Sequence, residues 1–213
     1  MVIKTAVIFG ASGGIGKVIQ QKLQYHFVTR TKRVDVTNEK EVVAYAKELK
    51  SVDVVIYCVG KIISNSIETI NINDFKNIFD INVFGAVNVT KVMLPIMTKN
   101  GHFIFISSLR ALESSKNKAA YCSSKAALDM FANVLRKEAG IKVTIVRPGY
   151  VDTDIYGEEQ LYPYSTITGD RMKVLLPKDV ADMVLLALQL GTIKEINIGE
   201  VYGERPDICF RKK

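Results

Sequence analysis

The sequence contains few of the residues that form disulfide frameworks or metal sites. Its 213 residues include three cysteines and two histidines, with no tryptophan. Cys58, Cys122 and Cys209 are odd in number and show no C-x-x-C spacing, which favours reduced thiols in a cytosol over disulfides. His26 and His102 are isolated and lie near the expected ends of elements, so we expect surface positions and assign them no chemistry. These absences predict a cytoplasmic protein without a metal site.

The sequence also lacks the hydrophobic runs that cross membranes or direct secretion. The longest unbroken apolar runs, such as Val54 to Val59, are far shorter than the ~20 residues that span a bilayer. No basic leader or cleavage-site pattern precedes the apolar segment Val2 to Phe9. With 48% hydrophobic and 24% charged residues, we expect one globular domain over residues 1–213 and no membrane partner.

The basic excess does not have the pattern typical of nucleic-acid-binding proteins. The formal net charge is +7, yet the dense basic clusters are only Arg30 to Arg33 and the tail Arg211 to Lys213. No stretch interleaves aromatic and basic side chains. We therefore expect no nucleic-acid partner and a solvated tail.

What the sequence does contain begins with a strand, a glycine-rich turn and a helix. Lys4 to Phe9 has the apolar, β-branched character of a strand, and apolar residues recur at helical spacing from Val18 to Leu23. In this context glycines permit a tight turn and close approach to a pyrophosphate, and the helix N-terminus offers free N–H groups. The predicted dinucleotide-binding residues of this turn are Gly10, Ser12, Gly14, Ile15 and Gly16.

A phenol and an ammonium lie one helical turn apart at Tyr121 and Lys125. Acid–base work near neutrality needs the phenol pKa lowered by roughly three units, or about 4 kcal/mol. A cation about 4 Å away at an effective dielectric of about 20 supplies that much. Such spacing also occurs by chance on ordinary helices, but Ser108, Asn82 and the glycine turn accompany it and together predict one site.

Several motifs in this order resemble those of the short-chain dehydrogenase/reductase family. They are Gly10-x-x-x-Gly14-x-Gly16, Asn82-x-x-Gly85, Ser107-Ser108, Tyr121-x-x-x-Lys125 and Pro148-Gly149-x-Val151-x-Thr153. The resemblance runs from about residue 5 to about residue 198. It implies a Rossmann-like α/β fold with a doubly wound parallel sheet.

The resemblance also implies roles for these residues. Tyr121 would be the general acid in reduction, Lys125 would lower its pKa and hold the nicotinamide ribose, and Ser108 would orient the substrate oxygen. The backbone of Asn82 would hold a water that links Lys125 to solvent. Val59 and Gly60 would approach the adenine ribose, Pro148, Gly149 and Val151 would lie on the nicotinamide side, and Thr153 would hydrogen-bond the carboxamide.

The end of the second expected strand bears on the choice of cofactor. Phe27 to Thr29 leads into Arg30 without an acidic residue, and an arginine there pairs with the 2′-phosphate of NADP. The resemblance also favours NADP(H), with Ser12 as a helper of Arg30 and NAD(H) as the open alternative. Asp35 has the spacing of a ribose-binding acid, about 20 residues after the glycines. The family's D-V-T segment instead places Asp35 and Val36 against the adenine.

The sequence departs from the family pattern at the same place. Only four residues separate Arg30 from Asp35, whereas a crossover between parallel strands needs about a dozen. We therefore predict that the helix between the second and third strands is missing, and that the third strand is vestigial or absent. Phe9, Tyr57 and Cys58 also replace family residues, which predicts a weaker hydrogen bond bracing the sheet.

These observations predict an NADP(H)-dependent oxidoreductase that interconverts a carbonyl and an alcohol on a small molecule. The alternative is a catalytically weak or inactive NADP(H)-binding sensor on the same fold. The departures at Phe9, Tyr57 and Cys58 and the missing helix favour it, whereas the complete set of catalytic residues argues against it. Residues 154–176 have no strong periodicity and are predicted to form a substrate lid. In the family, the helices carrying Asn82 and Tyr121 build dimers, which implies a homodimer or homotetramer; burial within one chain explains the same apolar positions.

Overall fold

A computed structural model describes residues 4–30, 32–156, 174–198 and 209–211. Its strands form one sheet in the order β2-β1-β3-β4-β5-β6-β7. Their bounds are β1 (Thr5–Phe9), β2 (Val28–Arg30), β3 (Val52–Tyr57), β4 (Met97–Ile106), β5 (Lys142–Pro148), β6 (Glu195–Ile198) and β7 (Cys209–Arg211). Neighbouring strands pair in parallel from β2 to β6, and β7 pairs antiparallel with β6.

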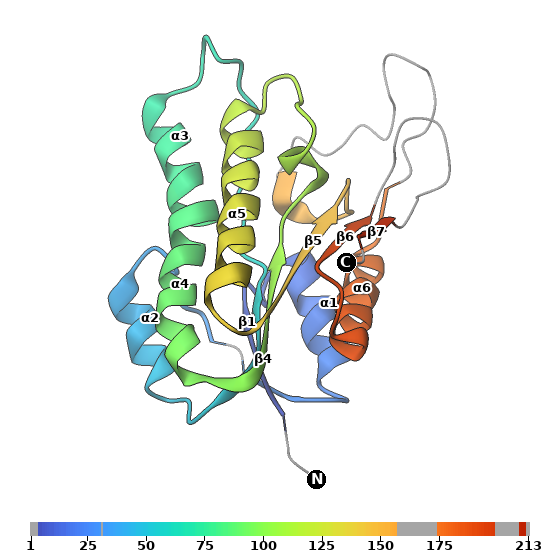
Figure 1. Cartoon of the computed structure of the whole chain (residues 1–213). Helices are drawn as coiled ribbons and strands as arrows, with labels where there is room; N and C mark the ends of the chain where they lie inside the picture. The colour runs from blue at the N-terminus through green and yellow to red at the C-terminus, as the bar shows by residue number, and fades with distance from the viewer. Residues whose placement is uncertain (1–3, 31, 157–173, 199–208, 212–213) are drawn as a thin grey trace.

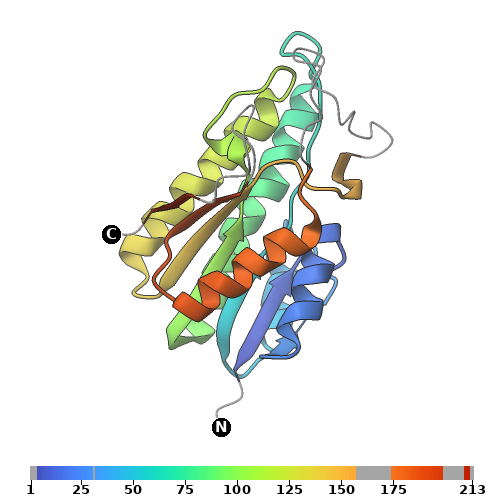
Figure 2. The same ribbon diagram turned by 90° about the vertical axis from the view of Figure 1, so that its right-hand side faces the viewer.

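Helices cover both faces of this sheet (Figure 1). The longer ones are α1 (Gly14–Leu23), α2 (Glu39–Ala46), α3 (Ile72–Phe79), α4 (Gly85–Met93), α5 (Ala119–Glu138) and α6 (Pro177–Leu190). A π-helical turn, η1 (Asp80–Phe84), joins α3 to α4, and short 3₁₀ turns lie at η2 (Leu94–Ile96), η3 (Leu109–Ala111) and η4 (Asp154–Tyr156). Figure 2 shows α1 and α6 together on one face, while α2, α4 and α5 lie on the other.

The alternation of side chains along β1 divides the apolar core in two. Ala6 and Ile8 pack with α1 and α6, whereas Val7 and Phe9 pack with α2, α4 and α5. Successive residues of a strand point to opposite faces, so a buried sheet needs apolar residues at every position. The unbroken apolar character of this strand follows from that requirement.

The path of the chain places a ligand-binding crevice beside β1. From β1 the chain moves outward to β2 at the edge, and it then returns to form β3 on the other side of β1. In doubly wound sheets such a reversal leaves a crevice at the carboxyl ends of the strands. The predicted Rossmann-like doubly wound parallel sheet is therefore confirmed.

The segment between β2 and α2 is compact. Residues 32–38 form no helix and no strand. Asp35 closes a turn, in which its Oδ1 accepts hydrogen bonds from the Thr37 backbone N–H at 2.9 Å and from the Thr37 hydroxyl at 2.7 Å. Asn38 then caps α2 by accepting from the Lys40 N–H. Within these described residues, β2 is the edge of the sheet.

One helical run and one histidine differ from the expectations drawn from the sequence. No membrane-crossing run was expected, yet the helical run Ile72–Ile96 is apolar enough to cross a membrane by length and composition alone; in this fold it packs against α2 and α5. The expected surface position of His102 is wrong, because β4 begins at Met97 and places His102 inside the sheet. Its Nε2 lies 2.8 Å from the Thr144 hydroxyl, and burial lowers the pKa of His102 to about 4.

Candidate active site

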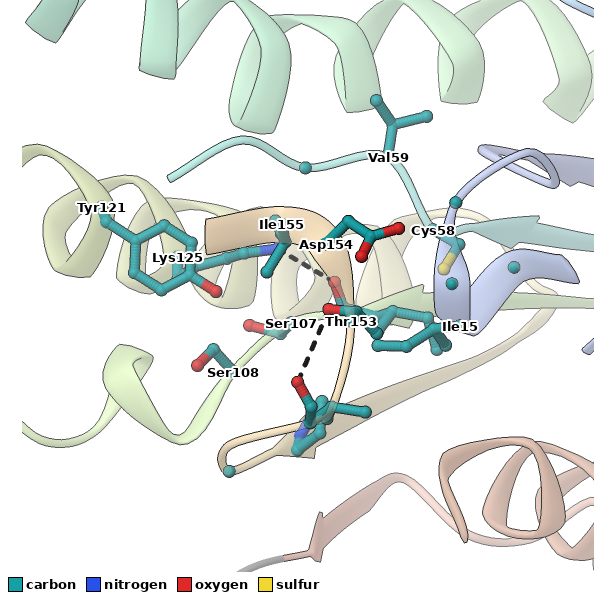
Figure 3. Close-up of a pocket in the computed structure, with 18 of the residues that line it drawn as sticks. Ile15, Cys58, Val59, Ser107, Ser108, Tyr121, Lys125, Thr153, Asp154 and Ile155 are labelled. Carbon is teal, nitrogen blue, oxygen red and sulfur yellow. Dashed lines mark hydrogen bonds between the residues drawn. The ribbon is translucent and has the colours of Figure 1, made fainter. Parts of the chain in front are cut away.

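A pocket of about 370 Å³ lies at the carboxyl ends of β1, β3, β4 and β5 (Figure 3). Most of the residues that the sequence predicts to form the site line it. They are Ser12, Gly14, Ile15, Gly16, Val59, Gly60, Ser108, Tyr121, Lys125, Pro148, Gly149, Val151 and Thr153. Segments far apart in the sequence therefore meet in one cavity, at the crevice that the topology predicts.

Four other predicted residues are described but lie outside the lining of this pocket. Gly10 closes the turn beneath it, Asn82 is buried behind it, and Val36 is buried in the core. Asp35 lies in the exposed turn before α2, where Thr37 already occupies its Oδ1. Arg30 ends β2, and its side chain is outside the described part of the structure.

The glycine turn is shaped by contacts that leave no room for side chains. Gly10 has a φ of 87°, and a Cβ there would lie 2.7 Å from the carbonyl oxygen of Cys58. A Cβ on Gly16 would lie 2.1 Å from the carbonyl oxygen of Gly10. Helix α1 begins after Gly13 without a side-chain cap and without an acidic residue in its first turn. Its amides and its positive dipole end thus suit an anion in the pocket.

Three polar side chains converge at the other end of the pocket (Figure 3). Ser108 follows β4, and Tyr121 and Lys125 lie one turn apart on α5. All three are buried, with exposed fractions of 6%, 8% and 3%. The Lys125 Nζ donates a hydrogen bond to the Ile106 carbonyl at 3.1 Å and lies 5.8 Å from the centre of the Tyr121 ring. A hydroxyl, a phenol and an ammonium therefore lie together in a buried part of the pocket.

Burial controls the ionisation of this group. It raises the pKa of Tyr121 to about 12, against the opposing effects of the Ser108 side chain and the Arg110 charge. It also lowers the pKa of Lys125 to about 8, although the carboxylate of Asp129 acts in the other direction. The sequence predicts a lowered phenol pKa because of the lysine spacing, and that expectation is wrong for this arrangement. Desolvation outweighs the hydrogen bond of Ser108 and the charge of Arg110, while the Lys125 ammonium is hydrogen-bonded to the Ile106 carbonyl.

Asn82 is fully buried in the π-helical turn η1. Its Oδ1 accepts from the Lys61 N–H at 2.8 Å, and its Nδ2 donates to the Lys61 carbonyl and the Ser124 hydroxyl, both at 2.9 Å. The side chain therefore ties the segment after β3 to helix α5. An asparagine inside a helix has a low helix propensity, and the three side-chain hydrogen bonds of Asn82 offset that cost.

Tyr57 and Gly85 stabilise the same turn, and sequence reasoning did not assign them that role. The Tyr57 hydroxyl donates to the Ile81 carbonyl at 2.6 Å and so links the end of β3 to η1. A Cβ on Gly85 would lie 2.7 Å from that hydroxyl and 2.6 Å from Val36 Cγ2. Gly85 was identifiable only as the last residue of the Asn-x-x-Gly motif.

A buried ionic network lies behind Ser108 and was also missed. The Asp129 carboxylate accepts from the Ser107 hydroxyl and from Arg147 Nε, both at 2.5 Å. Arg147 continues through Nη1 to Glu195 at 2.9 Å. Since Lys125 binds the Ile106 carbonyl and Asp129 binds the next side chain, one face of α5 fixes the strand end that carries Ser108. The signal in the sequence was the spacing of four residues from Lys125 to Asp129.

Comparison with known sequences agrees with this geometry. A family model described as short chain dehydrogenase matches residues 21–161. An uncharacterized oxidoreductase from Staphylococcus saprophyticus subsp. saprophyticus is 30% identical, and the match covers 93% of this chain and 95% of the relative. The chain belongs to the short chain dehydrogenase family. As a member of that family it is an oxidoreductase.

Solved structures of short chain dehydrogenases have the same fold. A small-chain dehydrogenase in complex with NADPH matches with a TM-score of 0.84 and 22% identity, over 93% of this chain and 97% of that one. A short chain dehydrogenase/reductase from Burkholderia phymatum in complex with NAD matches with a TM-score of 0.77 and 20% identity, over 92% of this chain and 88% of that one. At these identities the likeness establishes the architecture alone.

Proposed function

We propose that this short chain dehydrogenase uses NADP(H) to interconvert a carbonyl and an alcohol on a small molecule. The observation that carries the proposal is the meeting of Ser108, Tyr121 and Lys125 in one pocket with the uncapped glycine turn. A protein that only bound a nucleotide would have no use for a buried hydroxyl and phenol beside an ammonium. The arrangement supplies a proton donor, an orienting group and a positive charge at one place.

Tyr121 is the proposed general acid in the direction of reduction. With its pKa raised to about 12, the phenol is protonated at neutral pH. That is the form that gives a proton to a carbonyl oxygen as negative charge develops on it. The hydroxyl of Ser108 hydrogen-bonds the same oxygen and fixes its position. Oxidation of the alcohol needs the phenolate, so we expect its rate to rise at alkaline pH.

Lys125 and Asn82 support this proton transfer. With a pKa of about 8, Lys125 is mostly charged at neutral pH, and its ammonium stabilises the phenolate that remains after Tyr121 has donated. Asn82 holds the segment at Gly60 and Lys61, and this segment faces the Lys125 ammonium. A Cβ on Gly60 would lie 3.4 Å from Lys125 Nζ and 3.6 Å from Asn82 Oδ1. A water relay through the Asn82 backbone stays a prediction.

The pocket fits a dinucleotide cofactor. The amides of the glycine turn and of the α1 N-terminus suit its diphosphate, and Ser12, Gly14, Ile15 and Gly16 would hold it. Val59 and Gly60 would contact one ribose, and Tyr121 and Lys125 the other. Pro148, Gly149, Val151 and Thr153 would flank the nicotinamide, which supplies or accepts the hydride when bound.

Arg30 supports NADP(H) as the preferred cofactor over NAD(H). It ends β2, where a guanidinium suits a 2′-phosphate. Asp35, the acid with ribose-binding spacing, is engaged with Thr37 through Oδ1. NADPH accompanies one structural neighbour and NAD another, so both cofactors occur on this fold.

We further propose a cytoplasmic homodimer or homotetramer. Three large apolar side chains on η1 and α5 are exposed: Phe84 at 56%, Met130 at 65% and Val134 at 43%. Their burial against a second copy would remove apolar surface from water. Cys58 and Cys122 are free thiols, which suits a reducing compartment.

The experiment is a panel of aldehydes and ketones assayed for NADPH oxidation, with Tyr121→Phe prepared in parallel. We expect at least one carbonyl to accelerate NADPH oxidation by the wild type and not by Tyr121→Phe. If the protein binds NADPH and no carbonyl accelerates its oxidation, the non-catalytic sensor replaces the enzyme. Equal rates for wild type and Tyr121→Phe would also contradict the proposal.

A further inference from the structure

Arg110 lies beside the proposed reaction centre and has no part in the chemistry described so far. It is the second residue after Ser108, and its backbone N–H donates to the Ser108 hydroxyl oxygen at 3.1 Å. This hydrogen bond begins the 3₁₀ turn η3, which packs against α5 and β5. The guanidinium is therefore attached to the same short segment that positions Ser108.

The side chain of Arg110 is partly buried, and its guanidinium has few partners. Its side chain is 21% exposed, and its Cζ lies 5.6 Å from the centre of the Tyr150 ring. Within the described part of the chain it donates no hydrogen bond, and its only carboxylate contact is Glu113 Oε2 at 3.8 Å. A guanidinium has five N–H donors, and a buried charge is costly unless it is hydrogen-bonded. The guanidinium of Arg110 thus has more N–H donors than acceptors among the described residues.

The residues that line the cavity carry no net formal charge. The charged ones are Lys125 and Asp154, whose formal charges cancel, and Arg110 lies next to this lining without being part of it. Arg110 adds a positive charge beside Ser108, close enough to lower the pKa of Tyr121. Glu113 offsets it only partly, because its side chain is 48% exposed and its contact exceeds hydrogen-bonding distance.

We propose that Arg110 binds the carboxylate of the substrate, so that the substrates are oxo acids and the corresponding hydroxy acids. The inference rests on the proposed carbonyl chemistry at Ser108 and Tyr121. A carboxylate matches the planar fork of a guanidinium through two parallel hydrogen bonds. It would supply the acceptors that Glu113 does not, while the Tyr150 ring supports the other face of the fork. The carboxylate is unchanged by the reaction and serves only recognition.

The test compares pyruvate, acetoacetate and levulinate with their methyl esters, which keep the carbonyl and lose the negative charge. Wild type, Arg110→Met and Glu113→Gln are assayed with NADPH. We expect the wild type to prefer at least one acid over its ester in kcat/KM by about tenfold or more, as a charge-assisted pair provides. Arg110→Met loses that preference, which is measured as the ratio of kcat/KM for acid and ester on the same variant. Glu113→Gln retains or increases the preference, because it removes the competing carboxylate.

The ester serves as an internal control for folding, since a variant that reduces the ester is folded and catalytically competent. Reduction of acid and ester at equal rates by the wild type would overturn the role of Arg110 and leave the proposed oxidoreductase intact. An acid preference that survives Arg110→Met would overturn it as well. Failure of every acid, every ester and every uncharged carbonyl would contradict the proposed function itself, and the inference with it.

Discussion

The two ends of the nucleotide region are held in different ways. At the catalytic end, Ser108, Tyr121 and Lys125 are at most 8% exposed and are fixed by β4 and α5. The other end is here called the β2 end (Arg30 and residues 32–38). Residues 32–38 form no helix and no strand, and Asp35 is held by its own turn. The catalytic end belongs to the core, whereas the β2 end is a short surface segment.

This difference separates two properties that one enzyme must combine. Burial sets the ionisation of Tyr121 and Lys125, so the chemistry depends on the packing of β4 against α5. The β2 end touches that packing at Val36, which fits against Gly85. Substitutions at the catalytic end should therefore change turnover, and substitutions at the β2 end should change cofactor affinity and choice.

Apart from Tyr121→Phe, the largest effect is expected from Ser108→Ala at the catalytic end. It removes the hydroxyl that orients the substrate oxygen, and we expect kcat to fall by about 10²-fold or more. The dissociation constant for NADPH, measured by fluorescence titration, should stay within about threefold of the wild-type value. A mutation that removes an interaction made only in the transition state leaves cofactor binding unchanged. A parallel loss of NADPH affinity would break the proposed separation of the two ends.

Arg30→Ala tests the β2 end with the next largest effect. Loss of a charge-assisted contact to the 2′-phosphate should weaken NADPH binding by about ten- to a hundredfold and leave NADH binding unchanged. The turnover number at saturating NADPH should be that of the wild type. Unchanged NADPH affinity would remove the support for NADP(H) preference.

Asp129→Asn tests whether the buried carboxylate of Asp129 sets the pKa of Lys125 at the catalytic end. The Asp129 carboxylate raises the pKa of Lys125 against burial, so its neutralisation should lower that pKa further below about 8. The ammonium is then lost at lower pH, and the alkaline limb of the kcat/KM profile should move to lower pH. Ser107→Ala is the matched control, because it removes the partner hydroxyl and keeps the carboxylate. If the alkaline limb moves equally in Asp129→Asn and Ser107→Ala, the shift comes from a structural change and not from the lost charge.

The smallest effect is expected from Asp35→Asn. Asp35 is exposed and its carboxylate is occupied by Thr37, which also lowers its pKa. We expect changes of about threefold or less in the affinities for both cofactors, as for an exposed polar group. A selective loss of NADH affinity in titrations would instead identify Asp35 as a ribose-binding acid.

The sequence predicts the parts of the site that depend on local pattern. The glycine turn, the Ser108 strand end and the Tyr121–Lys125 spacing each lie within one short segment, and the structure brings all of them to one pocket. What could not be predicted depends on contacts between distant segments. Asn82 to Ser124, Tyr57 to Ile81 and Asp129 to Ser107 join residues whose proximity only the packed fold defines.

Burial explains the two expectations that were wrong. His102 and the phenol of Tyr121 were judged from neighbours in sequence, but their pKa values are set first by desolvation. Strand β4 extends five residues before His102, and no local signal marked that start. The predicted lid over 154–176 falls mostly on residues 157–173, outside the described residues.

The most direct test of a catalytic rather than a binding role is Tyr121→Phe, with NADPH affinity and carbonyl reduction measured on one preparation. The phenyl ring keeps nearly all of the buried volume and loses only the hydroxyl group whose proton the mechanism uses. We predict an NADPH dissociation constant within about threefold of the wild type and a fall in kcat of about 10²- to 10⁴-fold. Full turnover in Tyr121→Phe would contradict the account, because the proton would then come from another group.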